Sequence, residues 1–250
     1  MLEPLDLRTS LDAATARVVR PGTAAAQAYA SLRDAIASLR FRPGQSFSEL
    51  EVARQLGVSR TPVREAVIRL AESGLIDVLP QRGNLVRKIS RKAVEDAHFV
   101  REAIEVAVVR EAATITLPAT FFTAAGKLIE AQQAAAGDND LQRFLALDDA
   151  LHRSIAEAAG RKQVWSVVEM QKTQMDRVRT LALAGVVPYA RIIAQHEAIL
   201  EAIERRDAAA SEAAVHTHLA ETTAVLEPLR RQHPDLFEPE PRSTSPATVS

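Results

Sequence analysis

The sequence predicts a mainly α-helical chain: an N-terminal winged helix-turn-helix with a small β-hairpin wing, then an all-α antiparallel helical bundle. Three observations support this fold class. Aromatic residues make up only 4% of the 250 residues, and alanine is abundant, which favours helices over strands. A capped basic helix follows a glycine-containing turn near residue 60. Beyond residue 90, apolar residues recur at helical spacing, and no segment is typical of a strand.

Composition narrows the class of protein. The sequence has no cysteine, which excludes disulfides and thiolate metal sites. It has neither an apolar run of membrane-spanning length nor a signal-peptide pattern, so we expect a cytoplasmic protein. Residues 24–92 hold twelve Lys/Arg and six Asp/Glu, whereas residues 93–250 hold sixteen and twenty-three. A basic front half and an acidic rear half favour two domains with different partners, the first partner being nucleic acid.

The front of the chain divides into an arm and a small domain. Residues 1–22 show no sustained apolar period and end in Pro-Gly, which predicts a flexible N-terminal arm. Residues 23–90 are expected to form the winged helix-turn-helix. Its first helix is predicted from Ala24 to Leu39, and its second from Leu50 to Leu56, after a cap at Ser48 and before a turn at Gly57.

The segment Ser59–Leu70 predicts the second helix of the helix-turn-helix. Ser59 or Thr61 can cap it, and Pro62 suits the first helical position. The apolar stripe comprises Val63, Val67 and Leu70. The arginines left to face outward are Arg60, Arg64 and Arg69. Such a helix can lie in the DNA major groove, and the alternative is an ordinary helical hairpin with a solvated basic face.

Two β-leaning segments follow, Leu75–Pro80 and Leu85–Ile89, around a turn at residues 81–84. They predict a two-stranded hairpin with a basic tip. Directly after a recognition helix such a hairpin is a wing, in which Gly83 would let the backbone and Arg82 approach phosphate or the minor groove. A plain surface hairpin is the alternative.

The rear of the chain is predicted to be a helical bundle over residues 91–232, with short links between antiparallel helices. The expected helices cover residues 90–115, 118–136, 140–159, 162–184, 188–206 and 208–232. Residues 233–250 are rich in Pro and Ser and are predicted to be a disordered tail with no core to join.

Four side chains of the bundle form a candidate metal site. Asp148 and His152 lie four residues apart on the helix expected over 140–159. His196 lies on the helix expected over 188–206, and His218 on the helix expected over 208–232. Imidazole and carboxylate suit a divalent ion: zinc first, with nickel or manganese as alternatives. Spacing leaves two other interpretations open: an exposed or capping Asp/His pair, and His216 in place of His218.

The same residues allow other functions. A bound metal with an open coordination position can activate water, so a metal-dependent hydrolase with an accessory helix-turn-helix is the rival hypothesis. A non-catalytic scaffold is a third. The sequence contains neither a phosphate-binding glycine loop nor a serine nucleophile elbow.

These motifs together resemble the GntR superfamily of bacterial transcription regulators, in particular the FadR-type branch with the FCD effector domain. The front match, over about residues 28–90, includes Leu32-Arg33, Pro43-Gly44, Ser48-Glu49, Leu56–Leu70, Gly74-Leu75 and Arg82-Gly83. The rear match, over about residues 93–228, includes Val100-Arg101 with Glu105, Asp148, His152, Ala158–Gly160, His196-Glu197 and His218-Leu219.

The resemblance implies a homodimer that binds a palindromic double-stranded DNA operator, and a shorter, VanR-like FCD domain of six helices. It implies a metal held by Asp148, His152, His196 and His218, and so selects His218 over His216. A small organic acid, of the sugar acid or hydroxy acid class, would bind against the metal and weaken operator binding, as in a repressor.

The resemblance also assigns residue roles. Those expected on DNA are Arg60 and Arg64 at base edges or phosphates, Thr61 and Arg33 at phosphates, and Arg82 and Gly83 at the wing. Arg69 could equally be solvated. Arg101 is expected to clamp the ligand carboxylate, unless it pairs with Glu105 or Glu102. Independently of the resemblance, Arg177 and Arg179 could reach the pocket or a dimer surface, and their spacing does not decide between the two.

Three positions depart from the family pattern: Leu151 where an aromatic residue is frequent, Arg161 where Asn is usual, and Leu50 where a basic residue is frequent. None of them is a metal ligand. They affect the expected shape of the pocket and the preference for DNA sequence.

Overall fold

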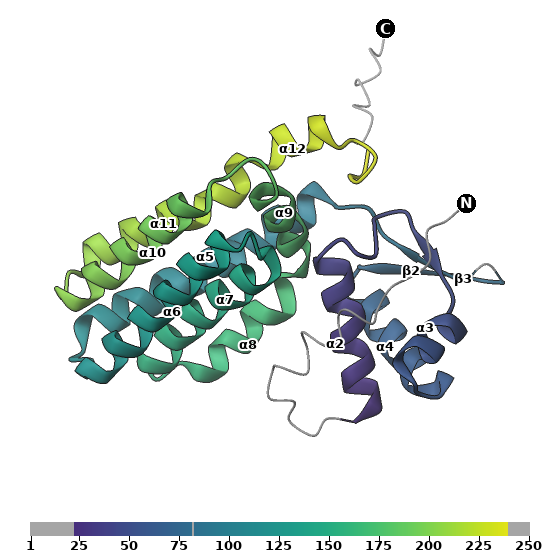
Figure 1. The fold of residues 1–250 in the computed structure, drawn as a ribbon, viewed down its shortest axis with the longest axis horizontal. Coiled ribbons are helices and arrows are strands. Elements are labelled where there is room, and N and C mark those ends of the chain that lie inside the picture. The colour runs from purple at the N-terminus through teal and green to yellow at the C-terminus, as the bar shows by residue number, and fades with distance from the viewer. Residues whose placement is uncertain (1–22, 82, 240–250) are drawn as a thin grey trace, which may run out of the picture.

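A computed structural model describes residues 23–81 and 83–239 of the chain (Figure 1). The predicted N-terminal arm, Arg82 at the predicted wing tip, and residues 240–250 of the predicted tail lie outside the described residues. The described chain forms a small head with three helices and a sheet, and beside it an elongated bundle of helices.

The head is built on three helices, α2 (Ala24–Ala37), α3 (Glu49–Leu56) and α4 (Arg60–Glu72). Thr23 and Ser48 cap α2 and α3 by accepting hydrogen bonds from the backbone N–H groups of Ala26 and Glu51. The turn between α3 and α4 requires a left-handed residue, which Gly57 supplies with a φ of 65°. This is the predicted helix-turn-helix.

The start of α4 differs from the prediction in two details. Ser59 is the N-cap residue, but its side chain makes no capping hydrogen bond. Pro62 is the third helical residue, because the helix already begins at Arg60. A proline costs nothing there, since the N–H groups of the first turn have no partner within the helix.

The wing is part of a three-stranded antiparallel sheet in the order β1-β3-β2, formed by β1 (Ser46–Phe47), β2 (Ile76–Leu79) and β3 (Gly83–Val86). Val78 pairs with Asn84 in the hairpin, and Phe47 pairs with Asn84 from the other side. The sequence predicted only the hairpin, because a two-residue strand is too short to show alternation. Gly83 has a φ of 85°, and a Cβ there would lie 3.0 Å from Phe47 O, so glycine suits this crossing.

The bundle contains eight helical segments within the described residues. They are α5 (Arg91–Thr114), α6 (Ala119–Gly137), α7 (Leu141–Ala158), α8 (Lys162–Gln171), α9 (Thr173–Leu183), α10 (Tyr189–Glu204), α11 (Ala208–Ala224) and α12 (Leu226–Gln232). Apolar side chains from these helices form one core, and the head has a separate core of its own. None of the described helices has the length and apolar character needed to cross a membrane.

Two of the six predicted helices are broken. The helix predicted over 208–232 ends at Ala224, because Pro228 has no N–H and its ring clashes with the carbonyl four residues earlier. The helix predicted over 162–184 bends at Lys172 without a proline or glycine. The bend lets α8 pack on α5 and α7 while α9 packs on α2 of the head. Tertiary packing therefore places this break.

The prediction that the chain beyond residue 232 has no core to join is wrong for residues 233–239. Leu236 and Phe237 are buried in the core of the bundle. Phe237 forms a parallel β-bridge with Ile89, in the chain that leads from β3 into α5. The Pro/Ser-rich composition belongs mainly to residues 240–250, and it concealed a short apolar anchor.

Helix α9 forms the contact between bundle and head. Gln174 Nε2 donates to Gly74 O at 3.3 Å, and Thr180 Oγ1 donates to Ala37 O at 3.0 Å. Both acceptors are backbone carbonyls of the head. A shift of α9 would therefore act on the head at two points.

Candidate functional site

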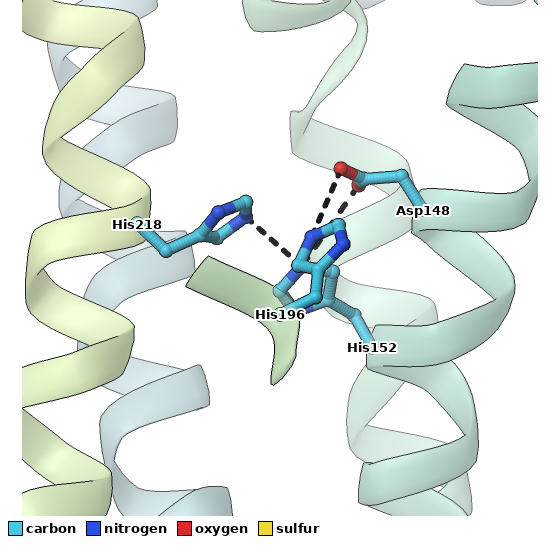
Figure 2. A group of neighbouring side chains, drawn as sticks. All are labelled: Asp148, His152, His196 and His218. Atoms are coloured by element: carbon cyan, nitrogen blue, oxygen red, sulfur yellow. Dashed lines mark hydrogen bonds and ion pairs between the residues drawn. The ribbon is translucent and has the colours of Figure 1, made fainter. Parts of the chain in front are cut away.

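Three helices of the bundle bring the four predicted metal ligands together (Figure 2). Asp148 and His152 come from α7, His196 from α10 and His218 from α11. All four are buried, and one ligand atom from each lies within 4.8 Å of the others. The exposed or capping pair considered for Asp148 and His152 is therefore wrong, and His216 is not part of the cluster.

Each histidine of the cluster has its Nδ1 atom close to an oxygen of another side chain. The pairs are His152 Nδ1 with Glu105 Oε2 at 2.6 Å, His196 Nδ1 with Gln132 Oε1 at 2.8 Å, and His218 Nδ1 with Gln195 Oε1 at 3.2 Å. Gln132 Oε1 and Gln195 Oε1 accept, so the Nδ1 atoms of His196 and His218 carry the proton, and His152 Nδ1 faces the Glu105 carboxylate. The Nε2 lone pairs are left facing the centre of the cluster, as metal-bound histidines require.

The inward nitrogens face one another or the Asp148 carboxylate. His152 Nε2 and His218 Nε2 lie 3.1 Å apart, and His196 Nε2 lies 3.3 Å from Asp148 Oδ1 without the alignment of a hydrogen bond. Burial lowers the pKa of both His196 and His218, which disfavours protons between these nitrogens. A divalent cation would satisfy all four groups, so the residues fit the predicted metal.

Glu105 supports the cluster from α5. Arg101 Nε donates to Glu105 Oε1, so the predicted ion pair is present with Glu105 as its partner, while Arg101 Nη2 is left for another acceptor. Burial alone would raise the pKa of Glu105, but Arg101 and then His152 hold it at about 2. Glu105 is therefore an anion that orients His152 and balances Arg101.

A cavity of about 30 Å³ adjoins the cluster. Its polar walls include Asp148, His218, Arg101 and Arg179, and Thr222 lies beside them. Arg101 Nη2 is buried and has no hydrogen-bond partner. An unpaired guanidinium N–H next to a candidate metal site is a ready donor for a carboxylate.

Arg179 connects this cavity to a group of acidic side chains. It donates to Asp148 through Nη2, and its Nη1 lies 3.2 Å from Asp149 Oδ1 and 3.1 Å from Asp176 Oδ1. Lys172 Nζ bonds the same two residues, at 2.8 Å from Asp149 and 2.7 Å from Asp176. Burial alone would lower the pKa of Arg179, but Asp148, Asp149 and Asp176 raise it above its usual value.

Arg177 lies neither in the wall of the cavity nor at the surface, so the structure places it at neither of its two predicted positions, the pocket or a dimer surface. It is fully buried on the side of α9 that faces the head, where Nη1 donates to Arg87 O at 2.7 Å and Nη2 donates to Gln174. Burial lowers its pKa to about 10. Arg177 and Arg179 are two residues apart on α9, and side chains at this spacing point to different sides of a helix.

The candidate nucleic-acid face is the exposed side of α4. Arg60, Thr61 and Arg64 are exposed there, and the side chain of Arg60 is 65% exposed although it lies 3.3 Å from Glu49. Ile68 is also exposed on this helix, and Leu50 on α3. Within the described residues, nothing covers these side chains, so a DNA duplex could reach them.

The other predicted DNA contacts are more constrained. Arg69 stacks over the ring of Tyr29, with its guanidinium carbon 4.1 Å from the ring centroid. Arg33 is half-buried, and its guanidinium lies 3.4 Å from the Asp34 carboxylate. Burial alone would lower the pKa of Arg33, but Asp34 and Asp176 of the bundle raise it above its usual value. Gly83 starts β3 at the wing, and Arg82 lies outside the described residues.

Three side chains beside the Asp/His cluster were not predicted to contact its histidines: Glu105, Gln132 and Gln195. One signal was available for Gln132, since it lies on the apolar stripe of its helix with Ala125 and Ile129. A polar residue on a buried stripe needs a buried partner. Gln195 precedes His196 but bonds His218 on the next helix, which only the packing of α10 on α11 reveals.

Comparison with protein families gives two matches. Residues 24–86 match the bacterial regulatory proteins of the gntR family, and residues 96–221 match the FCD domain. The HTH-type transcriptional repressor RspR of Escherichia coli is 37% identical over 214 residues, which cover 86% of this chain and 93% of RspR.

The chain belongs to the GntR family.

A further relative and a solved structure are also similar to this chain. An HTH-type transcriptional regulator of Streptomyces ambofaciens is 35% identical over 221 residues, which cover 88% of this chain and 90% of that protein. The solved structure of E. coli McbR/YncC has the same fold, with a TM-score of 0.73 at 19% identity over 83% of this chain and 99% of that one. A GntR head joined to an FCD domain makes this chain a DNA-binding transcriptional regulator.

Proposed function

We propose that this GntR-family regulator is a repressor whose bundle binds a divalent metal ion and, against it, a small organic acid. One observation carries the proposal: three histidine Nε2 atoms and a carboxylate converge beside a cavity that holds an unpaired arginine N–H. The ligand would be of the sugar acid or hydroxy acid class, because such acids offer both a carboxylate and a hydroxyl.

Asp148, His152, His196 and His218 would hold the metal, with zinc as the first candidate and nickel or manganese as alternatives. When bound, the ion supplies positive charge and open coordination positions for ligand oxygens. Glu105, Gln132 and Gln195 keep the three imidazoles oriented. Mutation of such supporting residues typically costs about 10–100-fold in metal affinity.

Arg101 and Arg179 would bind the ligand carboxylate. A cavity of about 30 Å³ holds little more than one or two waters, so an organic acid must displace side chains as it enters. Arg179 is shared among three aspartates, and a ligand carboxylate would compete with them for its guanidinium. Since Arg179 lies on α9, this exchange would change the support that α9 gives to the head.

The head would bind a palindromic operator as one half of a homodimer. Arg60 and Arg64 would contact base edges or adjacent phosphates, Thr61 a phosphate, and Gly83 the backbone near the wing. Arg33, if it contacts a phosphate, must do so from a half-buried position. Arg69 is better explained by its stacking on Tyr29.

Exposed apolar side chains on the bundle support a homodimer. Phe99 on α5 is 71% exposed and Met170 on α8 is 62% exposed, with Val167 exposed beside it on the same helix. Helices α5 and α8 pack against each other. Large apolar groups on adjacent helices are typical of protein interfaces, and a second copy of this chain is the proposed partner.

Operator fragments selected from a random DNA library, at fixed salt, provide the test. The purified protein is analysed for bound metal, and a panel of sugar acids and hydroxy acids is screened by thermal shift with and without zinc. We expect a metal-dependent rise in melting temperature with an acid that also weakens operator binding. A protein that selects DNA, yet binds no metal after exchange with zinc, nickel or manganese, would refute the metal and acid parts of the proposal.

A further inference from the structure

The linker between head and bundle, residues 87–90, is bonded by two segments of the bundle. The first is α9, in which Arg177 donates to Arg87 O at 2.7 Å. The second is the chain that follows α12, which runs parallel to the linker at Ile89. Ile89 N donates to Leu236 O at 2.9 Å, and Glu238 N donates to Ile89 O at 2.9 Å. Both backbone polar groups of Ile89 therefore bond the same C-terminal segment.

Burial and charge anchor this segment, which we call the clasp (residues 233–239). The side chains of Leu236 and Phe237 are buried in the core of the bundle, with Phe237 only 2% exposed, and Ile89 is fully buried in the same core. Arg87 Nη2 also lies 3.1 Å from Glu238 Oε1. In Figure 1 the clasp is the yellow stretch that turns back after α12.

Neither family match covers this contact. The gntR match ends at residue 86, and the FCD match covers residues 96–221. The linker and the clasp both lie outside these ranges. The contact therefore joins the two matched domains without belonging to the matched part of either.

We propose that Leu236, Phe237 and Glu238 are positioning residues for operator binding, which act by fixing the linker and hence the direction in which the bundle presents α4. This inference rests on the proposed function of a dimer on a palindromic operator. A dimer must place two recognition helices in major grooves at a fixed helical spacing. A free linker would let the heads adjust to several spacings, whereas a held linker makes the dimer selective for one.

Two variants test the clasp: Phe237→Ala, and a chain that ends after Gln232. The matched control is Phe144→Ala, because Phe144 is a fully buried phenylalanine of the same core that packs on Tyr189, with ring centroids 4.7 Å apart. Two measurements are made on the full dimer: the rate of tryptic cleavage after Arg87 and Lys88, mapped by mass spectrometry, and affinity for operators whose half-sites are moved apart or together by one or two base pairs.

We expect the wild type to bind one spacing at least about tenfold more tightly than its neighbours, because a held head cannot follow the rotation of the groove. Both clasp variants should be cleaved faster at the linker and should bind all spacings within about twofold of each other. Phe144→Ala should lose stability but keep the spacing preference. A general loss of stability lowers affinity for every spacing alike, so it cannot produce this pattern.

The results that would overturn the inference are distinct. Unchanged cleavage in the shortened chain would show that the segment does not hold the linker, and an unchanged spacing preference would show that holding it does not position the heads. A wild type without any spacing preference would overturn it as well. If the wild type selects no DNA at all, the proposed function fails, and the cleavage measurement still decides whether the clasp exists.

Discussion

The head and the bundle place their candidate functional residues in opposite environments. In the head, Arg60, Thr61 and Arg64 lie within one turn or so of a single helix and face solvent. In the bundle, Asp148, His196 and His218 come from three helices and are buried. An exposed site costs the fold little, whereas a buried polar site must be fully paired to be tolerated.

This difference predicts how the two sites respond to mutation. Removing an exposed arginine should weaken DNA binding and leave stability nearly unchanged, because exposed ion pairs contribute little. Removing a buried ligand should change stability in a way that depends on the metal. The following experiments test this contrast, from the largest expected effect to the smallest.

Loss of a metal ligand should have the largest effect. With free zinc at about 1,000 times its dissociation constant, binding to the folded state adds about 4 kcal/mol to the free energy of unfolding. His196→Ala should abolish this gain, measured by thermal or urea unfolding with and without zinc. His216→Ala is the matched control, since His216 is a half-exposed neighbour of the cluster that bonds Glu102 instead. An equal loss in both variants would contradict the assignment.

Arg60→Ala should weaken binding to a selected operator by about 1–3 kcal/mol, mainly at the base that the guanidinium contacts. The reason is loss of a charge-assisted contact on the exposed face of α4. Fluorescence anisotropy at fixed salt gives the affinity, and thermal unfolding should show almost no change. If Arg60→Ala and Arg64→Ala both keep operator affinity, α4 is not the recognition helix.

Glu105→Gln should reduce zinc affinity about tenfold, at the low end for supporting residues, because glutamine still offers an oxygen to His152 but removes the anion. Competition with a chelator measures the affinity. Operator binding without metal should be unaffected, since Glu105 lies in the bundle. Glu102→Gln is the control, because Glu102 lies three residues earlier on the same helix and outside the cluster. It should leave zinc affinity unchanged.

Arg69→Ala should have the smallest effect, a loss of stability of about 0.5–1 kcal/mol from the cation–π contact with Tyr29. Operator affinity should change by less than in Arg60→Ala. Urea unfolding and anisotropy on the same preparation separate the two effects. An affinity loss as large as that of Arg60→Ala would return Arg69 to the set of DNA contacts.

The sequence predicted the parts of this protein that depend on local patterns. Caps, glycine turns and apolar periodicity located the helix-turn-helix and most of the bundle, and the spacing of Asp148 and His152 placed them on one face. Local patterns failed where a contact joins distant segments. The third strand at Ser46–Phe47, the bend at Lys172 and the anchoring of Phe237 on Ile89 are all of this kind.

The candidate sites divide in the same way. The outward arginines of α4 follow from one amphipathic helix, so their exposure could be predicted. For the bundle, spacing alone could not choose between His216 and His218, and it placed Arg177 and Arg179 together although only Arg179 lines the cavity. The rotation of each helix about its axis decides such questions, and that rotation is set by packing.

By itself, the sequence determined which segments become helices, where the basic face lies and which side chains can serve as metal ligands, because these properties depend on neighbours within one or two turns. The tertiary structure alone decided that three Nε2 atoms meet beside an Arg101 Nη2 atom without a partner, and that residues 233–239 bond the linker at Ile89. Those features arise between segments far apart in the chain, where close packing fixes distance and direction.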